Sequence, residues 1–293
     1  MKIRILVSRH SSFYSPVIAA VTAGFLVEEG LEPTYGVLPK DRTARDLIRK
    51  REVDVVQAAV GSNWGPREKG ETDLPLHFAQ INQRDGFFLA GREPDPAFHW
   101  KKLEGKSLLA DHGGQPLFML KYAAHCQCVD WNKIDVIDAG NIEQIDAAFR
   151  DGRGDYVHQQ GPAPQQLDAE RIGHVVAAVG EAMPPVAFSS LMASPAFLES
   201  EMARAFTRAY RKARLWVTEA TPDEIAGREA VLFPGIKPAA LSNSIARYQK
   251  LGCWEGDLRI TRELYDQALN VFLHSRAISE RHPYEEVVVP PPA

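Results

Sequence analysis

Residues 103–122 read LEGKSLLADHGGQPLFMLKY and place a short apolar strand directly before a helix. The run KSLLA predicts a buried strand, and LFMLKYAAH, which begins at Leu117, has apolar residues at helical spacing. Gly113 and Gly114 form the turn between the two. Glycines at such a turn either make it tight or let the backbone approach a ligand, and both interpretations are open at this point.

The same order of strand and helix recurs on both sides of this stretch. An alternation of this kind with short connections predicts mostly parallel sheets with helices on both faces. Strands are expected at 2–8, 31–39, 53–60, 74–83, 86–93, 133–140, 154–160 and 184–194, and helices at 15–30, 41–52, 141–152 and over most of the chain from Pro195 onward.

A faint internal repeat accompanies this order. The segments ARDLIRKREVDVVQ (44–57) and QIDAAFRDGRGDYVHQ (144–159) each run from a helix through a turn to Asp, a nonpolar or aromatic residue, Val and Gln. Two lobes built on one plan would produce such a repeat. A chance likeness between two helix-to-strand junctions explains it equally well.

Composition restricts the class of protein. The chain has 293 residues, 45% hydrophobic and 25% charged, with a formal net charge of −4, which fits a globular protein with two lobes and argues against a nucleic-acid partner. No run approaches the roughly 20 apolar residues of a membrane span. Three cysteines without framework spacing favour a reducing compartment. The apolar run at the N-terminus is too short for a signal peptide. We therefore expect a cytoplasmic location, or a periplasmic one if the natural start lies upstream.

Three stretches together resemble a known fold family. AAVTAGFLVEEGLE (19–32), LIRKREVDVVQAAV (47–60) and the opening stretch (103–122) are similar, in this order, to type 2 periplasmic-binding-protein folds, and most closely to the SsuA/THI5-like (NMT1-like) proteins. The resemblance implies two α/β lobes, each with a mostly parallel sheet flanked by helices, and a hinge near 86–91 and 185–193. Lobe 1 would comprise 1–91 and 187–293, with the C-terminal helices, and lobe 2 would comprise 92–186.

What the resemblance implies for function is a small-molecule-binding protein related to the substrate-binding proteins of ABC transporters. The ligand would lie in the cleft between the lobes, would be anionic, and would be aromatic or heterocyclic in part. If the protein is exported, an ABC permease is the expected partner. A metabolic pathway or a regulator would take that place in the cytoplasm. No cofactor is expected.

The site can also be predicted without the family, because ligands of open α/β sheets lie beyond the carboxyl ends of the strands. Asp111 and Gln160 are among the residues at these ends. The candidates for ligand binding are Arg9, His10, Ser11, Ser12 and Tyr14 after the first strand; Ser62, Asn63, Trp64 and Arg84 after later strands of lobe 1; and His112, Gly113, Gly114, Gln115, His158 and Gln159 in lobe 2.

These candidates suggest an anion site. Gly113 and Gly114 would open the backbone to the ligand, and free N–H groups of the helix that begins near Gln115 would face its negative charge. Arginines and histidines would complement that charge, while Trp64 and Tyr14 would supply an apolar platform.

Each candidate also has a purely structural alternative. The glycines can simply form a tight turn, and Arg9 or Arg84 can pair with carboxylates. His158 can be a satisfied core histidine, and Trp64 can belong to loop packing. The stripe of Phe206, Tyr210 and Trp216 is predicted to be core.

An enzyme on the same scaffold is the alternative function: a decarboxylase, a desulfinase-like lyase or a pyrimidine-synthase-like protein. Ser11 stands near the position where the similar desulfinases have a nucleophilic cysteine, and serine is a weaker nucleophile without a base. The strand VDVVQAAVGSNWG (53–65) lacks the Lys and His that the similar pyrimidine synthases bear. His125, Cys126 and Cys128 do not have the spacing of a zinc site, so no metal is expected.

Overall fold

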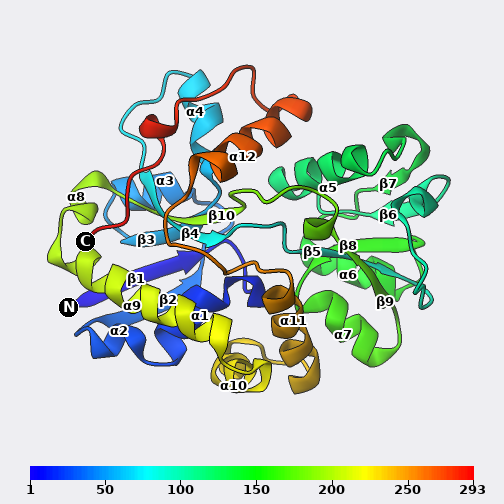
Figure 1. The fold of residues 1–293 in the computed structure, drawn as a ribbon, viewed down its shortest axis with the longest axis horizontal. Coiled ribbons are helices and arrows are strands. Elements are labelled where there is room, and N and C mark those ends of the chain that lie inside the picture. The colour runs from blue at the N-terminus through cyan, green and yellow to red at the C-terminus, as the bar shows by residue number, and fades with distance from the viewer.

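The computed structural model describes residues 1–293 and contains two five-stranded sheets, each flanked by helices (Figure 1). The first sheet has the strand order β2-β1-β3-β10-β4, and the second has the order β7-β6-β8-β5-β9. In each sheet four strands share one direction, while β10 or β5 runs antiparallel to both of its neighbours. The predicted fold class, a two-lobed α/β protein with a mostly parallel sheet in each lobe, is confirmed.

The strands of lobe 1, the lobe around the first sheet, are β1 (Lys2–Val7), β2 (Glu32–Val37), β3 (Val55–Ala58), β4 (Leu76–Asn82) and β10 (Ser189–Ala193). Those of lobe 2, the lobe around the second sheet, are β5 (Phe87–Gly91), β6 (Ser107–Leu109), β7 (Asp135–Ile137), β8 (Tyr156–Gln160) and β9 (His174–Ala178). Residues 83–86 and 179–188 connect the lobes.

The helices of lobe 1 are α1 (Ser15–Thr22), α2 (Phe25–Glu28), α3 (Ala44–Arg49), α4 (Trp64–Glu68), α8 (Pro195–Leu198), α9 (Glu201–Glu219), α10 (Pro222–Glu229), α11 (Pro238–Lys250) and α12 (Arg262–His274). Those of lobe 2 are α5 (Gln115–Cys126), α6 (Ile142–Arg150) and α7 (Ala163–Glu170).

The two sheets share one topology, which gives the internal repeat a structural basis. In each sheet β1 or β6 lies between the next two strands of the chain, which are β2 and β3 or β7 and β8. The antiparallel strand, β10 or β5, lies beside β3 or β8. The two repeat segments form α3 with β3 and α6 with β8, which occupy equivalent places in the two lobes. The interpretation as two lobes on one plan is therefore correct.

The boundary between the lobes differs from the predicted one by a strand. We expected residues 1–91 to belong to lobe 1, but β5 pairs with β8 and β9 of the second sheet. The crossover therefore lies at 83–86. It is hydrogen-bonded to the second crossover, because Val186 N–H donates to Gln83 O and the guanidinium of Arg84 donates to Gly180 O.

Local sequence explains the elements that carry the site. In β1 the side chains of Ile3, Ile5 and Val7 alternate inward and are fully or almost fully buried, as expected for a strand between two others with one face on the core. Helix α6 begins with a capping box in which Asn141 and Gln144 satisfy each other's backbone N–H groups. This cap fixes the first turn of α6, which faces the space between the lobes.

The helices of the long C-terminal region pack against both lobes. Phe206 and Tyr210 of α9 are fully buried, which confirms them as core, and Trp216 is half-buried against Phe25. Helix α11 packs against α7 of lobe 2, and α12 packs against α5 of lobe 2 (Figure 1). No helix combines the length and the apolar character that crossing a bilayer requires.

Candidate ligand-binding site

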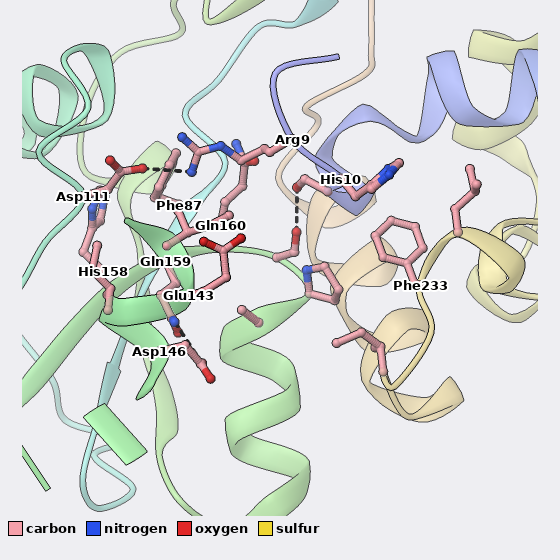
Figure 2. A pocket seen from close by; sticks show the side chains of 18 of the residues that line it. Arg9, His10, Phe87, Asp111, Glu143, Asp146, His158, Gln159, Gln160 and Phe233 are labelled. Atoms are coloured by element: carbon pink, nitrogen blue, oxygen red, sulfur yellow. Dashed lines mark hydrogen bonds and ion pairs between the residues drawn. The ribbon is translucent and has the colours of Figure 1, made fainter. Parts of the chain in front are cut away.

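A cavity of about 410 Å³ lies between the two lobes, at the carboxyl ends of β1, β6 and β8 (Figure 2). This is where an open α/β sheet is expected to bind its ligand. Lobe 1 contributes Arg9, His10, Ser11 and the segment around Phe233; lobe 2 contributes Phe87, Asp111, four residues of α6 (Ile142, Glu143, Ile145 and Asp146) and residues 158–163.

One ion pair crosses this cavity. The guanidinium of Arg9 donates to Asp111 Oδ2 over 2.8 Å, with 23% and 9% of the two side chains exposed (Figure 2). Burial alone would raise the pKa of Asp111, but the charge of Arg9 and the N–H of Gly113 outweigh burial and hold that pKa below its ordinary value. Arg9 is therefore already neutralised by a partly buried carboxylate.

His158 lines the cavity and stacks on Phe87 with 4.4 Å between ring centroids. The side chain is fully buried, and neither ring nitrogen has a hydrogen-bond partner in the structure. Burial lowers the pKa of His158 to about 3, so the imidazole is neutral and offers one N–H donor and one acceptor. The alternative of a satisfied core histidine is wrong, because both nitrogens are unsatisfied.

Gln159 has a fixed orientation. Its Nε2 donates to Asp146 Oδ1 over 3.0 Å. A carboxylate accepts hydrogen bonds and cannot donate them, so the amide nitrogen must face Asp146. Gln159 Oε1 is left buried without a partner, and Gln160 Oε1 is in the same state. These two oxygens are acceptors that call for a donor, since an unsatisfied buried polar group costs roughly 1–3 kcal/mol.

The cavity also has an unpaired carboxylate. Glu143 is exposed in the first turn of α6 and lines the cavity, and no cation lies within ion-pair distance of it. Asp146, one turn later, is paired with Arg150, which lies outside the cavity. With Arg9 engaged by Asp111 and His158 neutral, the one ionised side chain left unpaired in the cavity is that of Glu143.

The predicted anion cradle at the two glycines is not free for a ligand. Gly113 N–H donates to Asp111 Oδ1, and Gly114 N–H donates to His112 O, each over 2.8 Å. Gly114 has a φ of 88°, which a glycine tolerates, and Gln115 Nε2 donates to Phe188 O. The N–H groups of the two glycines are therefore not open to a ligand, and the tight turn accounts for both residues. Free N–H groups at the start of the helix near Gln115 stay a prediction.

His112 and Gly113 do lie near the cleft. They line a neighbouring cavity of about 660 Å³, which shares Arg9, His10, Asp111 and Glu143 with the first one. Gly114 and Gln115 line neither cavity. Of the predicted site residues, the structure brings five together around the first cavity: Arg9, His10, Ser11, His158 and Gln159.

Trp64 belongs to the core of lobe 1 and lines neither cavity of the cleft. Its side chain is fully buried, its Nε1 donates to Tyr265 OH over 2.9 Å, and its ring meets Phe272 edge-on. The neighbouring Asn63 is buried and donates to Pro75 O, and the backbone oxygen of Ser62 accepts from Arg45. The prediction that these three residues line the cleft was wrong.

The remaining predicted residues make contacts within the protein next to the site. Ser12 shares a 2.7 Å hydrogen bond with Ser244 of α11, and Tyr14 is almost fully buried beside Phe13. Arg84 links the two crossovers through Gly180 O. These three residues do not line the cavity.

Several lining residues were not predicted from the sequence. Glu143 and Asp146 lie on a helix, whereas the strand-end rule points only to residues that follow strands. Phe233 and Pro234 come from the loop between α10 and α11, far along the chain. The sequence FPG at 233–235 marks a loop within a helical region, but no local pattern places that loop at the cleft.

The geometry around Ser11 does not form a nucleophilic site. Ser11 Oγ donates to Gly161 O over 2.6 Å across the lobes, and the serine is almost fully buried. That contact links the lobes and gives the hydroxyl no base to activate it. Elsewhere in the chain, no group of three or more His, Cys, Asp or Glu side chains is arranged to hold a metal ion.

The two sheets of equal topology, joined by two crossovers around an interlobe cavity, define the fold of the periplasmic binding proteins. No family model matches the chain. A Bacillus subtilis (strain 168) protein, described as "Putative binding protein YtlA", is 29% identical over an alignment of 295 residues. The alignment covers 98% of this chain and 87% of that protein.

Solved structures agree on the fold. The periplasmic aliphatic sulphonate binding protein SsuA of Escherichia coli has a TM-score of 0.71 at 13% identity, over 99% of this chain and 92% of that one. The ligand binding component of an ABC-type import system from Staphylococcus aureus, solved with zinc bound, has a TM-score of 0.73 at 13% identity, over 99% and 97%. The predicted resemblance to SsuA-like proteins is therefore confirmed in fold.

Proposed function

We propose that this protein binds a small molecule between its two lobes, as substrate-binding proteins do, and that the ligand donates hydrogen bonds and carries a positive charge or none. The observation that carries this proposal is the set of buried acceptors without partners in the interlobe cavity, above all Gln159 Oε1. The fold and the relatives support the binding role, and the residues of this chain support the ligand class.

The charge of the cavity favours this ligand over the anion expected from sequence. The guanidinium of Arg9 is engaged by Asp111, whereas the carboxylate of Glu143 has no counter-charge. An amine or a protonated heterocycle would supply that counter-charge, and its N–H groups would satisfy Gln159 and Gln160. An anion would have to compete with Asp111 for the guanidinium of Arg9.

The shape of the cavity points to a ligand with a flat, partly apolar body. Phe87 and Phe233 line it from opposite lobes, and the stacked pair of Phe87 and His158 forms one wall (Figure 2). A cavity of about 410 Å³ is within the usual range for small-molecule sites. A heterocycle with an amino substituent combines these properties.

A partner follows only from the class of protein. If the chain is exported, we infer that an ABC permease receives the ligand. Within the cytoplasm, which remains the prediction from sequence, a metabolic enzyme or a regulator would receive it.

The experiment is native mass spectrometry of protein purified from cells, followed by a thermal-shift screen. We expect a retained small molecule, or stabilisation by amines and aminoheterocycles and not by sulfonates or carboxylates of similar size. A ligand at about 100 times its dissociation constant would add about 2.7 kcal/mol to the free energy of unfolding. Stabilisation by anions alone would overturn the ligand class, and no binding by any class would overturn the binding role.

A further inference from the structure

A basic cluster lies outside the interlobe cavity, where α5 of lobe 2 meets the end of α12 of lobe 1. Its side chains surround a cavity of about 290 Å³. The lining residues are Lys121 and His125 of α5, Val129 and Trp131 after it, and His274, Ser275 and Arg276 at the end of α12. No carboxylate lines this cavity.

The basic side chains are close together and have no counter-charge. The rings of His125 and His274 have centroids 4.6 Å apart, and Lys121 Nζ lies 5.7 Å from the centroid of the Trp131 ring. Neither histidine, nor Lys121, nor Arg276 takes part in any ion pair of the structure, although ion pairs are frequent elsewhere on the surface.

The cluster also shows signs of mutual repulsion and of an unmet hydrogen bond. Burial, together with the proximity of His125 and Lys121, lowers the pKa of His274. Ser275 Oγ is buried and has no hydrogen-bond partner. A negatively charged hydrogen-bond acceptor in this cavity would relieve the repulsion between the basic side chains and accept a hydrogen bond from the Ser275 hydroxyl.

A structural explanation accounts for only part of the cluster. His125 and His274 lie in the last turns of α5 and α12, where the helix dipole favours a cation. That explanation does not cover Lys121, which lies one turn earlier, or Arg276, which follows the helix. It also leaves Ser275 Oγ without a partner.

We propose that Lys121, His125, His274, Ser275 and Arg276 form a binding site for a small oxyanion of the phosphate or sulfate type. Because its donors come from α5 and from the end of α12, a bound oxyanion bridges lobe 2 and lobe 1. The oxyanion therefore strengthens the contact between the lobes at a place separate from the interlobe cavity.

The test is isothermal titration with inorganic phosphate, against sodium chloride at equal ionic strength, together with the shift in melting temperature. The parent protein is expected to bind one phosphate saturably and to melt at a higher temperature in its presence. The double variant Lys121→Gln/Arg276→Gln should bind phosphate roughly tenfold more weakly, since it removes two cationic donors of the site. The control Lys101→Gln/Arg228→Gln removes two exposed cations elsewhere and should bind like the parent.

Three outcomes would overturn the proposal. The first is an effect of phosphate that is not saturable or that chloride reproduces. The second is equal phosphate affinity in the parent and in Lys121→Gln/Arg276→Gln. The third is a loss of phosphate binding on Arg9→Gln with full binding by the Lys121 and Arg276 variant, which would place the anion in the interlobe cavity.

Discussion

Arg9 and Asp111 lie 102 positions apart in the chain, yet their side chains form a 2.8 Å ion pair that joins lobe 1 to lobe 2. Arg9 follows β1 and Asp111 follows β6, so the two residues occupy corresponding places in lobes of equal topology. The pair holds the lobes together over the cavity. The negative charge of Asp111 also balances the positive charge of Arg9, so the carboxylate of Glu143 is the unbalanced charge of the cavity.

Replacing Asp111 with Asn should therefore change which ligands bind. The amide that Asp111→Asn introduces keeps an oxygen for the N–H of Gly113 but no longer neutralises Arg9, so the guanidinium becomes available to an anion. We expect the affinity for methanesulfonate to rise roughly tenfold in isothermal titration. The matched control is Asp135→Asn, an exposed carboxylate outside the cavity. An unchanged affinity for methanesulfonate would show that the ion pair does not restrict anion binding.

Gln159→Leu should weaken binding of the ligand without weakening the fold. The substitution removes the buried acceptor Oε1, and we expect a roughly tenfold loss in affinity for the stabilising amine. The free protein should unfold at a similar urea concentration, because removing the unsatisfied buried oxygen offsets the loss of the hydrogen bond from Nε2 to Asp146. Gln267→Leu, on α12 and away from the cavity, removes an amide whose buried Nε2 has no partner and should leave affinity unchanged. Equal affinity in parent and Gln159→Leu would contradict the assigned role.

Trp64→Leu should show the opposite pattern. Trp64 packs between Tyr265 and Phe272 and donates to the Tyr265 hydroxyl, so its loss leaves a cavity in lobe 1. We expect the free energy of unfolding to fall by roughly 3 kcal/mol, measured by urea denaturation. Ligand affinity at a temperature where the variant is folded should stay within a factor of two or so of the parent value. A large loss of affinity at unchanged stability would show that Trp64 belongs to the ligand-binding site.

The contrast between Arg9 and Trp64 shows what could be predicted from the sequence. Periodicity and the alternation of elements predicted mostly parallel sheets flanked by helices, and the family resemblance implied two lobes. The strand-end rule found Arg9, His10, Ser11, His158 and Gln159, because β1 and β8 end at the cleft. The same rule failed after β3, because the residues that follow this strand pack against α12 in the core of lobe 1. Trp64 contacts Tyr265, which lies 201 positions later in the chain, and no local sequence pattern predicts that contact.

The lobe boundary and the charge of the site were unpredictable for related reasons. The pairing of β5 with the second sheet depends on contacts with β8 and β9, which come later in the chain. Counting arginines and histidines at strand ends suggested an anion, but the count could not show that Asp111 neutralises Arg9. It also could not show that burial keeps His158 uncharged.

Stability should fall as the pH rises towards 8. Burial raises the pKa of Glu229 to about 8, although Ser15 Oγ donates to its carboxylate, and burial raises the pKa of Asp85 to about 8 as well. The unfolded chain releases the Glu229 proton near its ordinary pKa of 4.5, whereas the folded chain keeps it up to about pH 8. Folding therefore binds a proton at each carboxyl in this window, whereas the buried His77 and His158, with pKa values lowered to about 3, release protons on folding below pH 6.5. The free energy of unfolding should therefore decrease with rising pH between about 6.5 and 8.

Glu229→Gln should reduce this dependence. The variant has no carboxyl group to ionise at 229, so its free energy of unfolding should fall less steeply between about pH 6.5 and pH 8, by up to about 1.4 kcal/mol per pH unit. Urea denaturation at a series of pH values measures the slope. Glu219→Gln, at an exposed position, should keep the slope of the parent. If both variants gave the parent slope, Glu229 would not be the group that titrates.

The most direct test of the central claim is a crystal structure of the protein with the compound it retains or that stabilises it most. We predict that the compound contacts both lobes, donates a hydrogen bond to Gln159 Oε1 and places its most positive group near the carboxylate of Glu143. A compound held through a negative group on Arg9, with Asp111 displaced, would contradict the proposed ligand class. A compound bound outside the interlobe cavity would contradict the site itself.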